Sequence, residues 1–330
     1  MTCFLGWGPE RPLQRQVTER LLHPTPVDVG RLQSLLASRL GGVAEHYQLV
    51  DRTRKGVAAV AERLPLAASD EVLASDHEYP ESHCDWLRAA DRRGFHYRQF
   101  PLGLPVSSHA HFLNQLEQAL QPGTRVLYFS HITCLTALKL PVAEICQLAR
   151  SRGVLTVIDG AHAVGQVELD LGSLQADFYC ACLHKWLGGA EPCGFVYAPK
   201  PLALPPPAIP RPGVWSASEV ALQIFEPPRR GSELAQKARQ LLADWSGLAP
   251  LQPAGPEWTA SMVAVALPHE GPPLELQSLL LEEGFCVNIH EFQGQMLLRL
   301  CLGEEDREED VVRLVGHLDR LVSLKFQRQV

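Results

Sequence analysis

Chemically versatile side chains follow four apolar, strand-like segments of this 330-residue sequence. In chain order they are Asp76, His77, Glu78 and Tyr79, then His131, Thr133 and Cys134, then Asp159 and His162, and finally His184 and Lys185. In open α/β sheets, ligands bind beyond the carboxyl ends of the strands. Each side chain alone has an ordinary structural explanation, such as a turn aspartate or a hydrogen-bonded core histidine. Their gathering at one sheet edge indicates a functional site.

Lys185, in the segment DFYCACLHKWLGG, indicates which chemistry such a site could perform. A lysine ammonium is costly to bury unless it is paired or neutralised, so Lys185 either reaches solvent or uses its amine chemically. A lysine amine can form a Schiff base with an aldehyde. A carboxylate that pairs with a pyridinium nitrogen completes pyridoxal phosphate chemistry, and Asp159, at the end of an apolar strand, is the candidate. The cluster therefore predicts a pyridoxal 5'-phosphate site.

Strand-like segments alternate with helical periodicity through the first two-thirds of the chain. The predicted strands lie within 71–79, 95–102, 124–133, 154–165, 176–185 and 193–199, and the clearest helices within 27–42, 113–123 and 141–153. Helices between apolar strands indicate a largely parallel sheet that is covered on both faces. The expected fold class is therefore α/β, with a three-layer, mostly parallel sheet and a small C-terminal α/β domain.

The segment APKPLALPPPAIPRPG, residues 198–213, has seven prolines in sixteen residues and predicts an extended linker. Beyond it, helical segments such as SELAQKARQLLADW alternate with strand-like ones such as ASMVAVALP and QMLLRLCL. We therefore expect an N-terminal arm at 1–26, a large cofactor-binding domain at 27–213, a linker and connecting helix at 214–247, and a small domain at 248–330.

The composition restricts the partners that we expect. The chain is 46% hydrophobic with a net charge of −7, and it has no dense run of Lys and Arg, so nucleic-acid binding is not expected. No segment approaches the roughly 18 apolar residues of a membrane span. The first residues, MTCFLGWGPERPLQRQ, lack a signal-peptide pattern. The sequence predicts a cytoplasmic protein without membrane contact, and its nine cysteines, which form no CxxC pair, are expected to be free thiols.

The segment VIDGAHAVGQVELDLGSLQADFYCACLHKWLGG resembles the aminotransferase class V family of fold-type I pyridoxal phosphate enzymes. Within that family it is most similar to the isopenicillin N epimerase and cysteine desulfurase branches, over about residues 43–198. The resemblance implies that Lys185 carries the Schiff base and later moves the α proton, while Asp159 pairs with the pyridine nitrogen. It also implies that His162 lies near the ring oxygen, that His184 touches the phosphate, and that Tyr79, in DHEYPES, stacks on the ring.

The segment DRTRKGVAAV stands where the family has an Asn-Ala-Thr-Glu-Gly type of turn at the start of a helix. By resemblance, Thr53, Arg54 and Lys55 would face the cofactor phosphate. Basic residues at a helix start oppose the helix dipole unless an anion lies there, so their presence favours phosphate binding.

Further contacts follow from the same resemblance. In SHITCLTALKLPVAEI, either Thr133 or Cys134 would contact the ring oxygen. RRGSEL resembles the family's Gly-Thr turn, in which Ser232 would replace the threonine that reaches the phosphate of the neighbouring subunit, which implies a homodimer. Arg299, in MLLRLCL, would clamp the carboxylate of a small amino-acid substrate, because a guanidinium can bind a carboxylate through two parallel hydrogen bonds.

The reaction stays open at this point. Removal of the α proton by Lys185 could lead to epimerisation or to transamination, and the sequence does not separate the two. Expulsion of a β-substituent, as in C–S lyases, is the alternative. A desulfurase needs a mobile cysteine loop in the small domain, but Cys286 and Cys301 lie in strand-like segments, which disfavours persulfide chemistry.

Two other classes of protein are weighed against this one. A metal hydrolase could use Asp76, His77, His131, Asp159 and His162, but their spacing matches no compact motif such as HExxH and would leave Lys185 unexplained. A non-catalytic relative that still binds the cofactor is the second alternative. A nicotinamide enzyme is disfavoured because no GxGxxG sequence opens the first helix.

Overall fold

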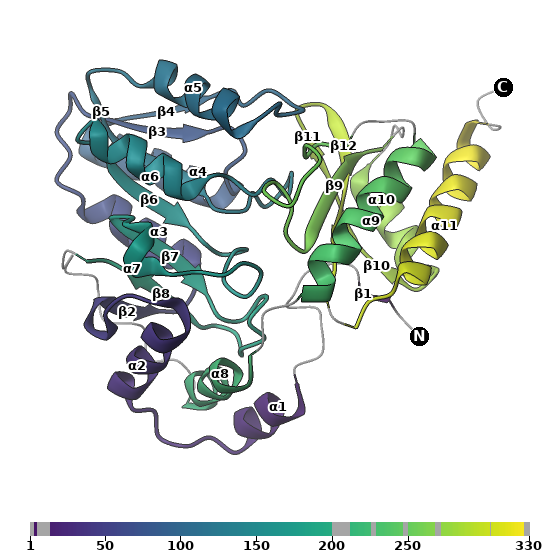
Figure 1. Ribbon diagram of the computed structural model, residues 1–330, viewed down its shortest axis with the longest axis horizontal. Helices are drawn as coiled ribbons and strands as arrows, with labels where there is room; N and C mark the ends of the chain where they lie inside the picture. Colours follow the sequence, from purple (N-terminus) through teal and green to yellow (C-terminus); the bar gives the residue numbers. More distant parts are fainter. Residues whose placement is uncertain are drawn as a thin grey trace.

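The computed structural model describes residues 3–4, 14–199, 212–225, 229–246, 250–267, 272–303 and 305–326. A seven-stranded sheet and a three-stranded sheet organise these residues, each with its own helices (Figure 1). The larger sheet is mostly parallel and has helices on both faces, so the predicted fold class is confirmed.

The large sheet has the strand order β2-β8-β7-β6-β5-β3-β4. Its strands are β2 Tyr47–Val50, β3 Glu71–Ser75, β4 His96–Phe100, β5 Thr124–Ser130, β6 Leu155–Asp159, β7 Phe178–Cys182 and β8 Gly194–Tyr197. Strands β3 to β7 run parallel to their neighbours, whereas β8 pairs antiparallel with both β7 and β2. The register sets Ser130 opposite Asp159. The carboxyl ends of β3, β5, β6 and β7 therefore share one edge.

One helical layer covers each face of this sheet. Each strand contributes to both cores because its side chains alternate between the two faces. Leu127 and Phe129 of β5 point into one core, and Val126 and Tyr128 point into the other. The first core is covered by α2 Val29–Leu40, α5 His109–Ala119, α6 Val142–Ser151 and α8 Pro212–Ile224, and the second by α3 Thr53–Arg63 and α4 Pro80–Arg93. Shorter helices complete the layer: α1 Arg15–Leu22, the 3-10 helix η2 Ala44–His46, and α7 Leu171–Leu174.

The small sheet is antiparallel, with the order β11-β12-β9. Its strands are β9 Met262–Ala266, β11 Asn288–Phe292 and β12 Gln295–Cys301. The helices α9 Arg229–Ser246, α10 Pro273–Glu282 and α11 Glu308–Phe326 pack on it around a separate apolar core. A short strand near the N-terminus, β1 Cys3–Phe4, pairs in parallel with β10 Phe285–Cys286.

The two sheets meet through an apolar cluster formed by the loops of the large sheet and the face of the small one. Ile132 and Ala163 pack there with Met262 and Leu297. Helix α8 packs in the core of the large sheet and α9 in that of the small sheet, so two helices stand where the sequence predicts a linker and one connecting helix. Most of the proline-rich segment, residues 200–211, lies outside the described residues. The domain boundaries at 213 and 247 stay predictions.

Strand β6 stops at Asp159, where the sequence predicts that the apolar strand breaks. The chain turns at Gly160, where a Cβ atom would lie 2.1 Å from a ring carbon of Tyr179. Only glycine lets the backbone approach the tyrosine this closely. This turn leaves Asp159 as the last strand residue and places His162 in the segment that follows.

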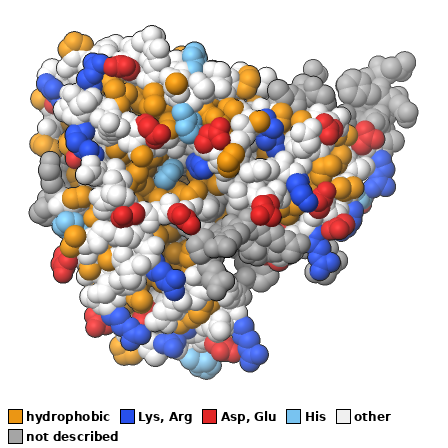
Figure 2. All heavy atoms as spheres, in the orientation of Figure 1, with side chains coloured by type: hydrophobic (Ala, Val, Ile, Leu, Met, Phe, Trp, Pro, Cys, Tyr) orange, Lys and Arg blue, Asp and Glu red, His pale blue; other side chains and the backbone are white. Residues whose placement is uncertain are grey.

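The surface shows positive and negative side chains interspersed over the face seen in Figure 2. Among the described helices, none combines the length and the apolar character that crossing a membrane requires. The eight cysteines whose side chains the structure describes are free thiols, as the sequence predicts.

Candidate active site

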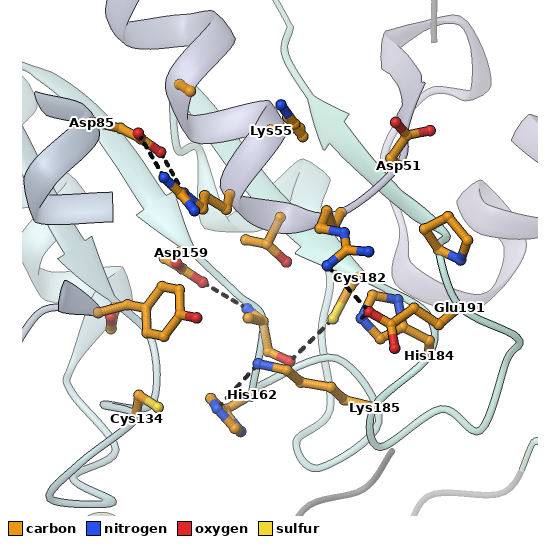
Figure 3. Close-up of a pocket in the computed structure, with 18 of the residues that line it drawn as sticks. Asp51, Lys55, Asp85, Cys134, Asp159, His162, Cys182, His184, Lys185 and Glu191 are labelled. Carbon is orange, nitrogen blue, oxygen red and sulfur yellow. Dashed lines mark hydrogen bonds and ion pairs between the residues drawn. The ribbon is translucent and has the colours of Figure 1, made fainter. Parts of the chain in front are cut away.

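The polar residues at the strand ends gather around a cavity of about 570 Å³ (Figure 3). Strand β6 ends at Asp159, the segment after β7 carries His184 and Lys185, and α3 begins at Thr53 on the opposite wall. Nine of the predicted site residues line the cavity: Thr53, Arg54, Lys55, Tyr79, Cys134, Asp159, His162, His184 and Lys185.

Lys185 is half-buried, and its amine lies beside an imidazole. The distance from Lys185 Nζ to His162 Nε2 is 3.2 Å. His162 is only 4% exposed, and burial lowers its pKa well below the ordinary value, with the nearby charges of Lys185 and Arg299 adding to the effect. The ring is therefore neutral at neutral pH and can share a hydrogen bond with the amine.

Asp159 is a buried carboxyl held in a fixed orientation. Its Oδ1 accepts a hydrogen bond from the backbone N–H of Ala161 at 2.9 Å, and its Oδ2 accepts one from the Tyr128 hydroxyl at 3.4 Å. Burial raises the pKa of Asp159, although the Ala161 N–H, Lys185 and Tyr128 partly offset this. A buried carboxylate with a raised pKa gains most from a cationic partner, and a protonated pyridine nitrogen would supply one.

His184 and Cys182 form the wall of the cavity below the start of α3. The Nδ1 atom of His184 lies 3.0 Å from the carbonyl oxygen of Cys193, and its Nε2 lies 3.9 Å from Glu191. Burial acts to lower the pKa of His184, but Cys182, Glu191 and the Cys193 carbonyl outweigh it, so the pKa is raised. A histidine that gains a proton easily is suited to an anionic ligand.

The start of helix α3 presents donors to the same end of the cavity. Its N-cap residue, Arg52, makes no side-chain capping hydrogen bond. The Thr53 hydroxyl is buried beside the Cys182 thiol and makes no well-formed hydrogen bond among the described residues. Arg54 lines the cavity, but its guanidinium binds both carboxylate oxygens of Asp85, at 2.6 and 3.0 Å. An uncapped helix N-terminus with an unsatisfied hydroxyl is suited to a phosphate group.

Three predicted site residues do not line the cavity. Thr133 is fully buried, and its hydroxyl accepts the Leu138 N–H at 2.8 Å, so it holds the turn while its neighbour Cys134 reaches the cavity. Arg299 is buried in β12 behind that turn, where its Nη1 donates to the Cys134 carbonyl. Ser232 lies in the first turn of α9, not in an open loop. The roles predicted for Arg299 and Ser232 stay predictions.

His77 and His131, from the alternative metal-binding set, are hydrogen-bonded to other groups of the protein. The ring nitrogens of His77 lie 2.8 Å from the Thr136 hydroxyl and 3.0 Å from the Leu102 carbonyl, and His131 Nδ1 lies 3.0 Å from the Tyr179 hydroxyl. Within the described part of the chain, no three His, Cys, Asp or Glu side chains are grouped so that they could hold a metal ion.

Comparison with known proteins agrees with this geometry. The sequence model of the family Aminotransferase class-V matches residues 51–207. The isopenicillin N epimerase of Streptomyces clavuligerus is 33% identical over an alignment of 375 residues, which covers 96% of this chain and 94% of that protein. The isopenicillin N epimerase of Amycolatopsis lactamdurans is 32% identical over 276 residues, with 71% and 69% covered.

Solved structures share the fold at low sequence identity. A cysteine desulfurase from Thermococcus onnurineus NA1 has a TM-score of 0.82 at 15% identity, covering 98% of this chain and 95% of that one. The cystine C–S lyase C-DES, in complex with cysteine persulfide, has a TM-score of 0.78 at 21% identity, with 96% and 97% covered. Together, fold and site define a pyridoxal-phosphate-dependent enzyme of fold type I. The chain belongs to the aminotransferase class V family.

The residues present fit the cofactor on physical grounds. The unsatisfied Thr53 hydroxyl and the uncapped start of α3 would hold its phosphate, with His184 beside them. Asp159 would face the ring nitrogen, and Lys185 would lie at the aldehyde end. Asp159 ends β6 and Lys185 follows the adjacent parallel strand β7, so both lie at the same edge of the sheet.

Other residues at the site were missed in the sequence. Glu191 and Asp85 line the cavity and pair with Arg52 and Arg54, and Cys182 lines it two residues before His184. The alternation of Cys180 and Cys182 along β7 was the one available signal for Cys182, because it indicates that both point to one face. No local pattern signals Asp85 or Glu191, since their partners come from another segment of the chain.

Proposed function

We propose that this protein catalyses proton transfer at the α-carbon of a small amino acid, as an epimerase or an aminotransferase does, with Lys185 as the group that moves the proton. The observation that carries the proposal is the position of Lys185 Nζ, in the same cavity as Asp159 and 3.2 Å from the neutral His162 ring. The epimerases among its relatives, which align over most of the chain, support this choice of reaction class.

Bound pyridoxal phosphate supplies an aldehyde for amines and a ring that withdraws electrons from the α-carbon. The protein supplies the remaining functions. Asp159 provides a fixed negative charge for the ring nitrogen, while Lys185 accepts the α proton. Tyr79 lines the same cavity, and burial, with Glu81 adding to it, raises the pKa of its hydroxyl, which therefore keeps its proton. Because its hydroxyl keeps a proton, Tyr79 is a candidate to return a proton to the α-carbon from a different side than Lys185.

C–S lysis is the second candidate, because several relatives carry the name L-cysteine desulfhydrase. Desulfuration with a persulfide carrier is less well supported. Cys286 lies in the short strand β10, and Cys301 is fully buried in β12. Neither is placed on a loop that could enter the cavity. Cleavage without a cysteine carrier stays the alternative, as does a relative that binds the cofactor without turnover.

The test starts from the purified full-length protein with its cofactor. Borohydride treatment followed by peptide mapping should find the cofactor fixed to Lys185. Amino acids incubated with the protein in heavy water should exchange their α proton, and Lys185→Ala should abolish this exchange while the fold is kept. Inversion of configuration would identify an epimerase, amino transfer to a 2-oxo acid an aminotransferase, and release of sulfide from cysteine a lyase.

Lys55→Ala is the matched control, because Lys55 lines the phosphate end of the same cavity. This variant should bind the cofactor more weakly but retain α-proton exchange once it is saturated. Full exchange activity in Lys185→Ala would refute the proposal. A yellow protein that exchanges no amino acid would identify a non-catalytic relative.

A further inference from the structure

Trp186, the residue after Lys185, makes a directional hydrogen bond inside the site. Its indole Nε1–H donates to His162 Nδ1 at 3.3 Å, and the other ring nitrogen of His162 lies 3.2 Å from Lys185 Nζ. An indole N–H can only donate. His162 Nδ1 must therefore carry a lone pair, and the three side chains form a chain of hydrogen bonds that ends at the amine.

The state of the His162 ring follows from this contact. Burial is the main reason that the ring does not take a second proton, and the Arg299 guanidinium of β12 adds to it; a cationic Lys185, in the segment after β7, would act in the same direction. A neutral imidazole that accepts at Nδ1 carries its proton on Nε2. The atom turned toward Lys185 is therefore an N–H donor. An amine with a lone pair can accept from that donor, whereas an ammonium group would oppose it with its own hydrogens.

Both partners of the indole contact are held in place. Trp186 packs against the apolar cluster between the two sheets, and Gly165 approaches it so closely that a Cβ would lie 2.6 Å from its carbonyl carbon. The His162 carbonyl accepts a hydrogen bond from Gln166, whose own side-chain oxygen accepts the Ser261 N–H at 2.8 Å. The turn that carries His162 is thus anchored next to the start of β9, which restricts where its ring can lie.

We infer that Trp186 is a positioning residue that fixes His162 in the Nε2–H tautomer and so presents a hydrogen-bond donor to the amine of Lys185. The inference rests on the proposed function in one respect, namely that Lys185 is the reacting amine. Its chemical consequence is that a hydrogen-bond donor, not an acceptor, faces the Lys185 nitrogen that would bind an aldehyde or accept a proton.

The first measurement is the tautomer itself, which requires no turnover. The nitrogen resonances of ¹⁵N-histidine-labelled full-length protein, assigned with His162→Gln, should show an Nε2–H imidazole at position 162. Trp186→Phe keeps an aromatic ring but removes the donor, and it should yield the Nδ1–H tautomer or a mixture. Trp245→Phe is the matched control, because it removes an indole hydrogen bond to Asp319, of 3.2 Å, on helix α9. This control should leave His162 unchanged.

The second measurement is the pH midpoint at which the absorption of the bound cofactor changes. Without the indole N–H, His162 would no longer hold an N–H group toward the Lys185 nitrogen, so a proton on that nitrogen should be opposed less. The midpoint in Trp186→Phe should therefore rise by about 0.5 to 1 pH unit, the equivalent of one hydrogen bond. If Trp186→Phe does not fold, benzothienylalanine at position 186 keeps the shape of the indole without its N–H.

Retention of the Nε2–H tautomer after removal of the indole donor would overturn the inference. The proposed function fails separately, by absence of the cofactor from Lys185 after borohydride treatment. The tautomer measurement would still decide the role of Trp186 in that case, since it requires neither cofactor nor substrate.

Discussion

Glu78 is a buried carboxyl directly behind the active-site cavity. It is 3% exposed, its Oε1 accepts from the Ser75 hydroxyl at 2.6 Å, and its Oε2 accepts from the N–H and the hydroxyl of Ser130. Burial raises its pKa to about 7, although the serine hydrogen bonds oppose the rise and Asp159 adds to it. The folded protein thus keeps a proton on Glu78 at pH values where the unfolded chain has lost it.

This shift predicts a pH-dependent effect of Glu78→Gln. Because the folded state binds more protons between about pH 4.5 and 7, the stability that Glu78 contributes falls as the pH rises through this window. Glutamine keeps the shape and does not titrate, so from about pH 5 to pH 8 the variant should gain up to about 3 kcal/mol relative to the wild type. Chemical denaturation at both pH values measures it. Glu81→Gln, on the exposed face of α4, should show no such trend; a parallel trend there would contradict the assignment.

For single residues, the sequence pattern predicted which side chains follow the ends of strands. It did not predict side-chain orientations that depend on how a turn folds. Lys185 and Asp159 could be found because apolar strands stop at or just before them. Thr133 and Cys134 were equal candidates for the cavity wall. The turn decides between them, because the Leu138 N–H binds the Thr133 hydroxyl and leaves Cys134 to line the cavity.

Helix α3 carries the element-scale prediction, because its N-terminus faces the cavity without a side-chain cap. Thr53→Val keeps the side-chain shape but removes the unsatisfied hydroxyl. Pyridoxal phosphate should then bind about 5- to 10-fold more weakly, as expected for one lost hydrogen bond, while pyridoxal without its phosphate should be unaffected. Titration by fluorescence or absorbance measures both ligands.

Thr259→Val is the control for that experiment. Thr259 is also buried with an unsatisfied hydroxyl, but it does not line the cavity. Its substitution should leave both affinities unchanged. Equal weakening of pyridoxal and pyridoxal phosphate by Thr53→Val would show that the hydroxyl does not recognise phosphate.

Sequence patterns failed to predict helices that lack one apolar face and one polar face. Helix α8 was expected as part of a linker, yet Val214, Trp215, Ala217 and Leu222 are all buried in the core of the large sheet. A helix that is buried nearly all round lacks the alternation of apolar and polar residues that identifies an amphipathic helix. The RRGSEL segment was expected to be a turn, but Gly231 and Ser232 belong to helix α9.

At the scale of the whole molecule, side chains of the small sheet and of the segment before β9 hold the turn that carries Cys134. Arg299 donates to the carbonyl of Cys134, His290 Nε2 lies 3.0 Å from that of Leu135, and Gln252 donates to that of Ala137 at 2.7 Å. The two sheets are therefore joined by specific hydrogen bonds beside the cavity. The sequence could not predict these contacts, because each joins segments more than one hundred residues apart and no local pattern encodes them. The homodimer likewise stays a prediction.

Gln252 offers the sharpest test of this junction. It is fully buried, its Nε2 donates to the carbonyls of Ala137 and Met262, and its Oε1 accepts the Ala264 N–H at 3.2 Å. Gln252→Leu has a similar size but leaves three buried backbone groups unsatisfied, so the free energy of unfolding should fall by about 2–4 kcal/mol. Gln240→Leu, which loses an exposed hydrogen bond to Asp244, should change it by less than about 0.5 kcal/mol.

The same variant separates stability from function. If the turn with Cys134 is positioned by the small sheet, Gln252→Leu should also weaken pyridoxal phosphate binding under conditions where the protein is fully folded. The reason is that loss of the Ala137 contact removes one of the turn's links to the small domain, while the Leu138–Thr133 bond remains only within the turn itself. Titration of the cofactor at low temperature, with circular dichroism as the measure of folding, checks this. A destabilised variant with unchanged cofactor affinity would show that the large sheet alone positions the cavity wall.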